Sequence, residues 1–174
     1  INHLREFGRK SELKKEKVDI NIPIRGVFTI IGQQLALQNI DVTLDLCDSL
    51  PQIHAHSNRL EQVFFNLVTN ARDAVNMRQG PAENENTPRE INIRSWLEGD
   101  RVAVTVSDTG CGIAPQDLQK IFEPFFTTKT TGHGMGLGLS ISYGIVKDYG
   151  GDIEVGSEPG EGTTFKLSFP LPRT

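Results

Sequence analysis

Two glycine-rich stretches carry the residues of this chain that are best suited to chemistry. The first, D-T-G-C-G-I, begins with Asp108 at the end of the alternating segment R-V-A-V-T-V-S. The second, G-H-G-M-G-L-G-L-S, has glycine at every second position from Gly132 to Gly138 and runs into an apolar segment. Glycine lets a ligand approach the main chain closely, and a helix N-terminus offers phosphates unpaired N–H groups and a positive dipole. This pattern predicts a nucleotide site.

The segment between the two stretches, F-E-P-F-F-T-T-K-T-T, predicts a cover for that site. Its phenylalanines can anchor it, and Lys129 can meet negative charge. A phosphate loop of the G-x-x-x-x-G-K-[ST] type is excluded because the chain contains no Gly-Lys pair. A dinucleotide fingerprint is excluded because its glycines must directly follow a strand inside a βαβ unit, whereas a segment with proline and threonine precedes the glycines that start at Gly132. Turns could explain any single glycine, but four at a spacing of two favour a phosphate site.

A line of polar side chains marks one flank of an apolar helical segment. Gln62, Asn66, Asn70 and Asp73 follow one another at spacings of four, four and three, which places them within an arc of roughly 80° on a helix. One interpretation is a polar flank bonded to nearby backbone. The other is a line of oxygen ligands for magnesium, which takes side-chain oxygens, phosphates and water. Next to the glycine-rich stretches, the magnesium interpretation is favoured.

Length and composition narrow the class of protein. A chain of 174 residues with 37% hydrophobic and 23% charged residues fits one soluble globular domain. The net charge of −4 argues against a general nucleic-acid binder, and means that a polyphosphate would need a metal ion or local cations. Cys47 and Cys111 are far apart, so a reducing cytoplasm is the expected location. His54 and His56 would share a strand face, a spacing that permits a metal, with ordinary strand positions as the alternative.

Hydrophobic periodicity predicts alternating helices and strands. Pro23 suits the first turn of a helix, and Ser57 is expected to cap another whose apolar stripe ends at Ala74. A third helix should bury Ile141. The expected helices span residues 24–38, 57–79 and 137–149. The expected strands span residues 18–22, 40–46, 52–56, 90–97, 101–107, 152–156 and 163–170. The order of elements predicts an α/β (α+β) two-layer sandwich, with a mixed, mostly antiparallel sheet of about five main strands covered on one face by three helices.

Five segments in order resemble the boxes of bacterial two-component sensor histidine kinases. N-L-V-T-N-A-R-D-A resembles their asparagine box, and D-T-G-C-G-I their first glycine box. F-E-P-F-F-T-T-K resembles the phenylalanine box, G-H-G-M-G-L-G-L the second glycine box and G-E-G-T-T-F the last box. The resemblance covers residues 20–170 and implies the Bergerat fold of this superfamily. Residues 1–17 then look like the end of a dimerisation-hairpin helix and a linker, and residues 18–174 like the catalytic and ATP-binding domain.

The resemblance implies a role for each residue around the adenine. Asp108 would accept a hydrogen bond from the adenine amine, with Thr163 or Thr164 nearby through water. Gly110 and Gly112 would let the main chain pass close to the base, against which Ile113 would pack.

At the phosphate end, the resemblance implies that Asn70 holds Mg²⁺, with Asn66 close to the metal and phosphates. Residues 122–133 would form a lid over ATP, and Lys129 would reach the terminal phosphates. The implied catalytic residues are Asn66 and Lys129, and the implied metal ligands are Asn66 and Asn70. The implied nucleotide site comprises Asn66, Asn70, Asp73, Asp108, Gly110, Gly112, Ile113, Phe122, Lys129, Gly132, His133, Gly134, Met135, Gly136, Leu137, Gly138 and Thr163.

One position separates the branches of the superfamily. The related ATPases have a glutamate where Asn66 stands, and an amide cannot take up a proton from water near neutral pH. The resemblance therefore implies transfer of the γ-phosphoryl group of ATP to a histidine. Two alternatives stay open: an ATP-driven conformational machine of the gyrase type, and a nucleotide-binding module without catalysis.

None of the four histidines has the context of a phosphoacceptor, so the acceptor is expected on a dimerisation hairpin outside this chain. The chain begins with Ile rather than Met, as expected for a piece of a longer protein. The resemblance implies a response-regulator receiver domain as a further partner and no nucleic acid. The longer protein is expected to form a homodimer and this piece a monomer. The expected location is cytoplasmic, within a sensor that could be membrane-bound.

Overall fold

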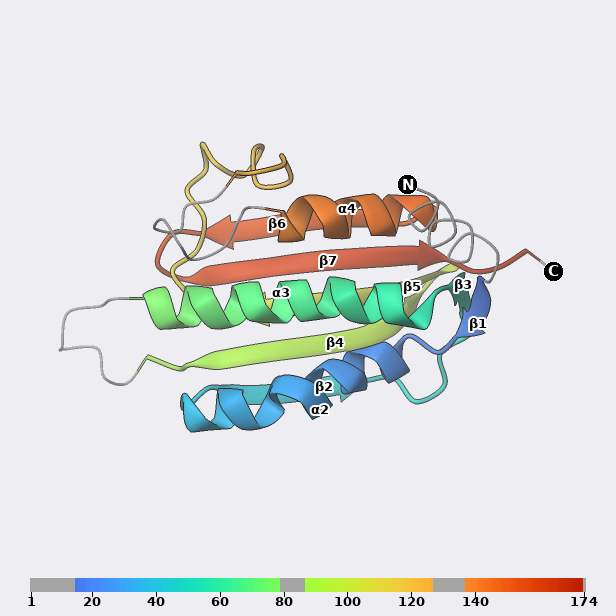
Figure 1. Cartoon of the computed structure of the whole chain (residues 1–174), viewed down its shortest axis with the longest axis horizontal. Helices are drawn as coiled ribbons and strands as arrows, with labels where there is room; N and C mark the ends of the chain where they lie inside the picture. The colour runs from blue at the N-terminus through green and yellow to red at the C-terminus, as the bar shows by residue number, and fades with distance from the viewer. Residues whose placement is uncertain (1–14, 79–86, 127–136, 174) are drawn as a thin grey trace, which may run out of the picture.

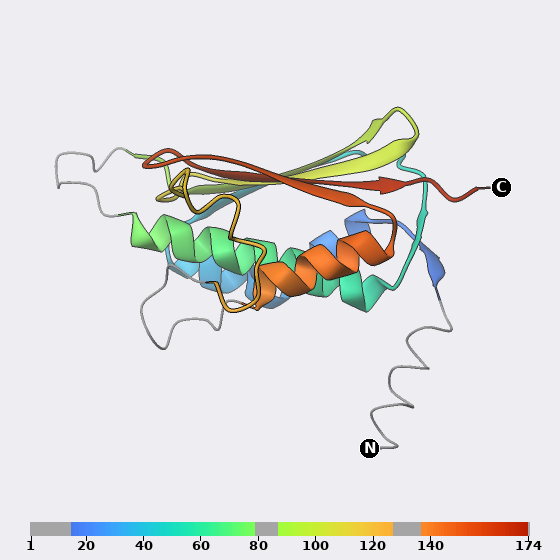
Figure 2. The ribbon, with the colours of Figure 1, turned by 90° about the horizontal axis from the view of Figure 1, so that it is seen from above.

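The computed structural model describes residues 15–78, 87–126 and 137–173. In this part of the chain, one face of a five-stranded sheet is covered by three helices, which lie side by side in a second layer (Figure 1). Seen from above, no helix of the described residues lies on the opposite face of the sheet (Figure 2). The predicted two-layer sandwich is confirmed.

The three helices are α2 (Asn21–Leu37), α3 (Ser57–Met77) and α4 (Gly138–Asp148). The strands are β1 (Glu16–Val18), β2 (Asp41–Leu46), β3 (Ile53–Ala55), β4 (Glu90–Glu98), β5 (Arg101–Asp108), β6 (Asp152–Glu158) and β7 (Gly162–Pro170). The main sheet has the order β2-β4-β5-β7-β6, and β1 pairs with β3 in a separate two-stranded sheet.

The sheet is mixed because one of its pairings crosses over through a helix. β2 and β4 run parallel, and the chain between them passes through β3 and α3. The other neighbours in the main sheet are antiparallel. β4 and β5 form a hairpin whose turn contains Gly99 at a φ of 63°, a left-handed conformation that glycine adopts without strain.

The core lies between the sheet and the helices. Phe64 and Leu67 of α3 are fully buried, as the helical spacing of apolar residues predicts. Phe165, Leu167 and Phe169 alternate inward along β7 and are at most 5% exposed. Among the described helices, none combines the length and apolar character needed to cross a bilayer.

The expectation of a strand over residues 18–22 is wrong. The chain already turns at Asp19, whose main-chain oxygen accepts the Ile22 N–H at 3.0 Å and whose side chain accepts the Asn21 N–H at 3.0 Å. This local turn starts α2 at Asn21, so the strand is β1, which ends at Val18. Pro23 lies in the first turn of α2, as predicted.

Three finer expectations about α3 and α4 also need correction. The cap of α3 is His56, in extended conformation and without a side-chain cap bond, and Ser57 is the first helical residue. The buried stripe ends at Val75, because Ala74 contacts the loop after β5 instead. Ile141 is 41% exposed, and α4 buries the next side of the helix, which carries Ser142, Ile145 and Val146.

Candidate nucleotide site

Asp108 and Thr163 lie opposite each other where β5 ends and β7 begins. They are register partners, and alternation places both on the face of the sheet that the helices cover. Thr163 is 5% exposed. Thr164 belongs to the other face, where its hydroxyl lies 2.9 Å from that of Ser107. Of the two threonines, Thr163 is therefore the one beside Asp108.

Burial raises the pKa of Asp108 to about 6, because removal from water disfavours the charged carboxylate. The main-chain N–H groups of Gly110 and Thr163 partly offset this effect, and the bond from Gly110 is 2.8 Å long. The net rise in pKa means that the ionised carboxylate of Asp108 lowers the stability of the folded state. Such perturbed groups are concentrated at functional sites.

The loop after Asp108 is fixed by contacts between main chains. A Cβ on Gly110 would lie 2.5 Å from the carbonyl carbon of Ala74, and the N–H of Cys111 donates to the Ala74 oxygen at 3.0 Å. Gly112 has a φ of 75°, and a Cβ there would collide with the main chain of Glu158. Gly110 and Gly112 were expected because the main chain should pass close to the base. The packing of this loop against Ala74 and Glu158 already requires glycine at both positions.

Ser157 is a part of the site that the sequence analysis missed. Its hydroxyl accepts the Ile113 N–H at 2.7 Å and donates to the Gly162 oxygen at 2.9 Å. Thr163 Oγ1 lies 2.9 Å from Ser157 Oγ, and Thr163 is the donor in that contact because the single hydroxyl proton of Ser157 is already used. Ile113 packs partly buried against the core. The only signal in the sequence is a serine next to the turn E-P-G-E-G.

Asn66 joins α3 to the beginning of α4. Its amide nitrogen lies 3.2 Å from the Gly138 oxygen and 3.2 Å from Ser142 Oγ. A carbonyl oxygen only accepts, so the nitrogen must face α4, and the amide oxygen is left for other partners. Ser142 is fully buried on α4, a polar exception in a buried face that helical spacing could have pointed out.

Asn70 lies one helical turn after Asn66 and is half-buried, on the flank that the spacing predicted. Asp73 is engaged by its neighbour: its Oδ1 accepts from Arg72 Nε at 3.2 Å and from Nη2 at 3.1 Å. Arg72 also donates to Gln34 Oε1 at 3.2 Å, which ties this end of α3 to α2.

The donor set on α3 fits Mg²⁺ that arrives with a nucleotide. No three His, Cys, Asp or Glu side chains gather into a metal cage anywhere in the described ranges. The oxygens that α3 offers here are amide oxygens, which are hard ligands that Mg²⁺ accepts. Mg²⁺ commonly takes one or two protein ligands and fills its octahedron with phosphate oxygens and water.

The segment after Ile113 is anchored by aromatic packing. The Phe122 ring lies 5.3 Å from that of Tyr143 on α4 and 6.3 Å from that of Phe165 on β7. Ile121 beside it is 4% exposed, whereas Phe125 is 69% exposed. The structure thus places Phe122 as an anchor of the expected lid.

The second glycine-rich stretch is only partly described. Leu137 is the cap of α4 and Gly138 its first residue, so the stretch does run into a helix N-terminus. The other expected residues of the lid and phosphate site lie outside the described residues: Lys129, Gly132, His133, Gly134, Met135 and Gly136.

Residues 55–173 match the family model described as histidine kinase-, DNA gyrase B- and HSP90-like ATPase. The chain belongs to this family. Its relatives include Sensor kinase CckA of Brucella abortus, 39% identical over 98% of this chain. Sensor histidine kinase ZraS of Escherichia coli is 34% identical over 98% of this chain. The chain spans 18% of the length of the first relative and 34% of the second.

Solved structures agree with this family. The catalytic domain of histidine kinase ThkA, in a nucleotide-free form, has a TM-score of 0.74 and 33% identity, over 91% of this chain and 96% of its own. Full-length ShkA in complex with AMPPNP also has a TM-score of 0.74, with 28% identity over 93% of this chain and 32% of its own. The resemblance read from the five boxes is confirmed: this is a histidine kinase ATPase domain of the sensor-kinase type.

Proposed function

We propose that this domain binds Mg-ATP and donates the γ-phosphoryl group to a histidine on the dimerisation hairpin of a longer sensor kinase. The observation that carries the proposal is the pair of Asp108 and Thr163, held by main-chain contacts at the end of the sheet that α3 and α4 cover.

Asp108 suits recognition of adenine because a carboxylate only accepts hydrogen bonds when ionised. The exocyclic amine of adenine donates, whereas the corresponding oxygen of guanine accepts. A guanine would therefore face a partly desolvated carboxylate without a proton to share, which costs binding free energy. The Thr163 hydroxyl, next to Asp108, suits a second contact through water.

At the phosphate end, Asn66 and Asn70 would hold Mg²⁺ through amide oxygens. The bond from the Asn66 nitrogen to Gly138 supports this role, since it turns the oxygen away from α4. When bound, Mg²⁺ would neutralise charge on the phosphates. The AMPPNP in the ShkA structure supports a triphosphate as the ligand here. Lys129 and the N–H groups of residues 134–138 remain the predicted contacts of the phosphates. His133 and Met135 remain predicted nucleotide-binding residues.

Transfer to a histidine is favoured over hydrolysis by the same Asn66. An amide can position a phosphate or metal but cannot deprotonate an attacking water. Catalysis would then consist of positioning and charge stabilisation, which is how enzymes promote phosphoryl transfer. A gyrase-type conformational machine, the alternative function, needs a base at this position.

The partners follow from this chemistry and from the relatives' names. The acceptor histidine is proposed to lie on the hairpin of the same protein, and the phosphoryl group to pass on to a response-regulator receiver domain. Residues 1–17 are proposed as the connection to the hairpin and residues 18–174 as the catalytic domain. The longer protein would act as a cytoplasmic kinase module in a homodimer, and the present chain as a monomer.

The test is a phosphorylation in trans with radiolabelled γ-phosphate. The chain alone should bind Mg-ATP, hydrolyse it very slowly and remain unlabelled. Addition of a purified hairpin that carries the acceptor histidine should produce an acid-labile, alkali-stable label on the hairpin. Asn70→Ala should abolish labelling with an unchanged circular dichroism spectrum. Gln33→Ala, which removes an exposed amide from α2, is the matched control and should label normally.

Two results would contradict the proposal. Fast ATP turnover by the chain alone would favour the ATPase alternative. Tight Mg-ATP binding without label on any hairpin tested, including the segment upstream in the same protein, would favour the module without catalysis.

A further inference from the structure

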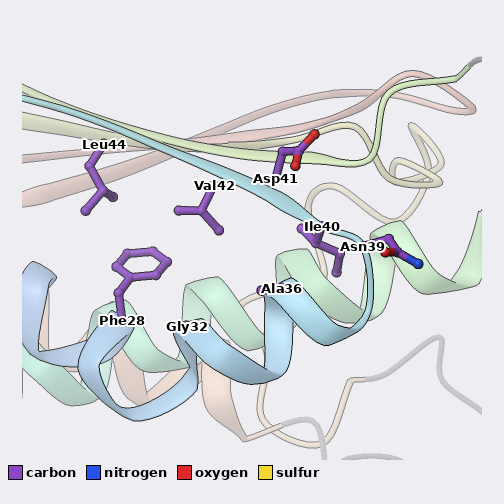
Figure 3. Close-up of a pocket in the computed structure, with 8 residues that line it drawn as sticks. All are labelled: Phe28, Gly32, Ala36, Asn39, Ile40, Asp41, Val42 and Leu44. Atoms are coloured by element: carbon purple, nitrogen blue, oxygen red, sulfur yellow. The ribbon is translucent and has the colours of Figure 1, made fainter.

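An apolar groove lies between α2 and β2, away from the loop that holds Asp108. Phe28 of α2 points toward Val42 and Leu44 of β2, whose side chains point back toward the helix (Figure 3). The groove has a volume of about 560 Å³ and is partly open to solvent. Leu44 is 38% exposed, an unusual degree for an apolar residue on the covered face of a sheet.

β2 is an edge strand, so one row of its main-chain groups is unpaired within the described part of the sheet. The Asp41 N–H donates to the main-chain oxygen of Arg89, just before β4, and the Cys47 N–H donates to that of Ser95 in β4. Alternate residues of a strand direct their main-chain groups to opposite edges. Val42 and Leu44 therefore present theirs to the free edge, and the same two residues line the groove.

Gly32 leaves the floor of the groove open. A Cβ at this position would meet only Phe28 Cβ, at 3.9 Å, so the neighbouring backbone does not require glycine. Glycine costs stability inside a helix, and one of its uses is to let another backbone approach closely. Ala36, one turn later, keeps the same side of α2 small.

The charges of β2 indicate which strand can be added. Asp41 is among the residues that line the groove, but its side chain points away from α2 (Figure 3), and alternation places Asp45 on the same outer face of β2. Asp45 has only a long, exposed contact of 3.8 Å with Arg94. If two copies of this chain paired antiparallel about Thr43, Asp41 of each would lie opposite Asp45 of the other. Like charges directly opposite each other destabilise a sheet, so a second copy is disfavoured in this register. A basic segment is complementary.

We propose that β2 and the groove beneath it bind an extended polypeptide segment in which apolar residues alternate with lysine or arginine. The segment would extend the sheet past β2 through main-chain hydrogen bonds. Its apolar side chains would enter the groove against Phe28 and Leu44, and its basic side chains would lie beside Asp41 and Asp45 on the outer face. Strand addition of this kind derives affinity from the main chain and selectivity from alternate side chains.

The test uses the acetylated, amidated heptapeptide K-V-K-V-K-V-K as the probe and E-V-E-V-E-V-E as its matched counterpart. Titration of isotope-labelled protein should give saturable amide shifts along β2 with the basic peptide, and at least tenfold weaker binding with the acidic one. Hydrogen exchange of the Val42 and Leu44 amides should slow when the basic peptide is bound.

Two variants and one control locate the binding. Gly32→Leu fills the groove and should weaken binding at least tenfold, and Asp41→Lys should do the same. Glu154→Lys makes an equal charge change on the outer face of β6, the other edge strand, and should leave affinity within twofold. ATP binding should be unchanged in all three, since none of them belongs to the nucleotide site.

The proposal is overturned if the basic peptide does not saturate, if both peptides bind equally, or if the shifts map to β6. It is also overturned if the free protein self-associates through β2, as shown by concentration-dependent sedimentation that Asp41→Lys alters. That last outcome would assign the groove to a second copy.

Discussion

The end of the sheet at Asp108 and the groove at β2 contain glycine for opposite reasons. Gly110 and Gly112 are crowded, since the main chains of Ala74 and Glu158 occupy the space of a side chain. Gly162, with a φ of 132°, is likewise pressed against the main chain of Asp108. Gly32 on α2 has almost nothing around it.

The difference concerns how far each region is ordered before its proposed ligand binds. Around Asp108, three segments touch through their backbones, so the carboxylate is placed before any ligand arrives, at the cost of desolvation. Between α2 and β2, the small residues Gly32 and Ala36 leave space for a ligand. The proposed peptide would have to fill this space itself. The crowded region should be intolerant of change and the open one tolerant.

Gly112→Ala is expected to have the largest effect. The left-handed backbone would be strained, and the new methyl group would collide with the main chain of Glu158. Strain of about 1 kcal/mol and overpacking of about 1–3 kcal/mol should together destabilise the domain. We expect ATP binding to be undetectable by calorimetry and the midpoint of chemical unfolding to fall. Normal binding would show that the loop is not fixed by this crowding.

Asp108→Asn should weaken ATP binding but raise the free energy of unfolding. Loss of a charge-assisted hydrogen bond, with an amide donor facing the adenine amine, should weaken ATP binding by about 1.5–3 kcal/mol. The substitution also removes a charge whose burial raises its pKa from 3.8 to about 6. At pH 7 the free energy of unfolding should therefore rise, by at most about 3 kcal/mol. Calorimetry and urea unfolding on the same samples measure both; unchanged ATP affinity would refute the assignment of Asp108.

Asn66→Asp should loosen the junction of α3 and α4. A carboxylate cannot donate to the Gly138 oxygen, so two oxygens would face each other where a hydrogen bond of 3.2 Å now lies. We expect a loss of about 1–3 kcal/mol in the free energy of unfolding. Thr69→Ala is the control: it removes a polar group whose hydrogen bonds stay within α3, and alanine favours a helix, so the free energy of unfolding should not fall in the same way. An unchanged unfolding curve would mean that the Asn66 nitrogen does not hold α4.

The pH dependence of ATP affinity should report the carboxylate of Asp108. If only the ionised form binds adenine and its pKa is about 6, affinity at pH 5 should be about tenfold lower than at pH 7.5. The Asp108→Asn variant corrects for protonation of ATP itself and should lack this component. Without nucleotide, the contribution of Asp108 to the free energy of unfolding depends on pH in the opposite direction. Between about pH 4 and 6 the folded state binds more protons than the unfolded state, so the contribution of Asp108 to stability falls as pH rises.

Gly32→Ala should have the smallest effect and the opposite direction to Gly112→Ala. The methyl group has room, and alanine favours a helix over glycine by about 0.5–1 kcal/mol. The thermal midpoint should rise by a few degrees with ATP affinity unchanged. A loss of stability comparable with that of Gly112→Ala would remove the distinction between the crowded and open regions.

Periodicity in the sequence was sufficient for the sheet and helices, because strands such as β7 and helices such as α3 bury one clear face. Periodicity was insufficient where hydrogen bonds of a few polar atoms decide where an element begins or ends. The Asp19 turn shortens β1 and starts α2 early, and no apolar pattern contains that information. The parallel pairing of β2 with β4 depends on how α3 crosses over, which a linear pattern does not specify.

The candidate site was predictable to the extent that its residues carry unusual chemistry. Asp108, Asn66 and Asn70 stood out by type and spacing, and the structure places them as that spacing implied. Ser157 and Ser142 were missed because their importance lies in contacts across the fold, with Ile113 and Asn66 respectively. A serine in such a role looks the same in the sequence as any exposed serine.

The small sheet of β1 and β3 lies next to the beginning of α3. β3 leads directly into α3 at Ser57, and the loop beyond Asp108 is bonded to Ala74 near the other end of that helix. At 1.5 Å per residue, these points are about 25 Å apart. A rotation of the domain about β1 would therefore displace Asp108 farther than any residue near β3. The length of α3 thus fixes how far Asp108 lies from the short sheet of β1 and β3.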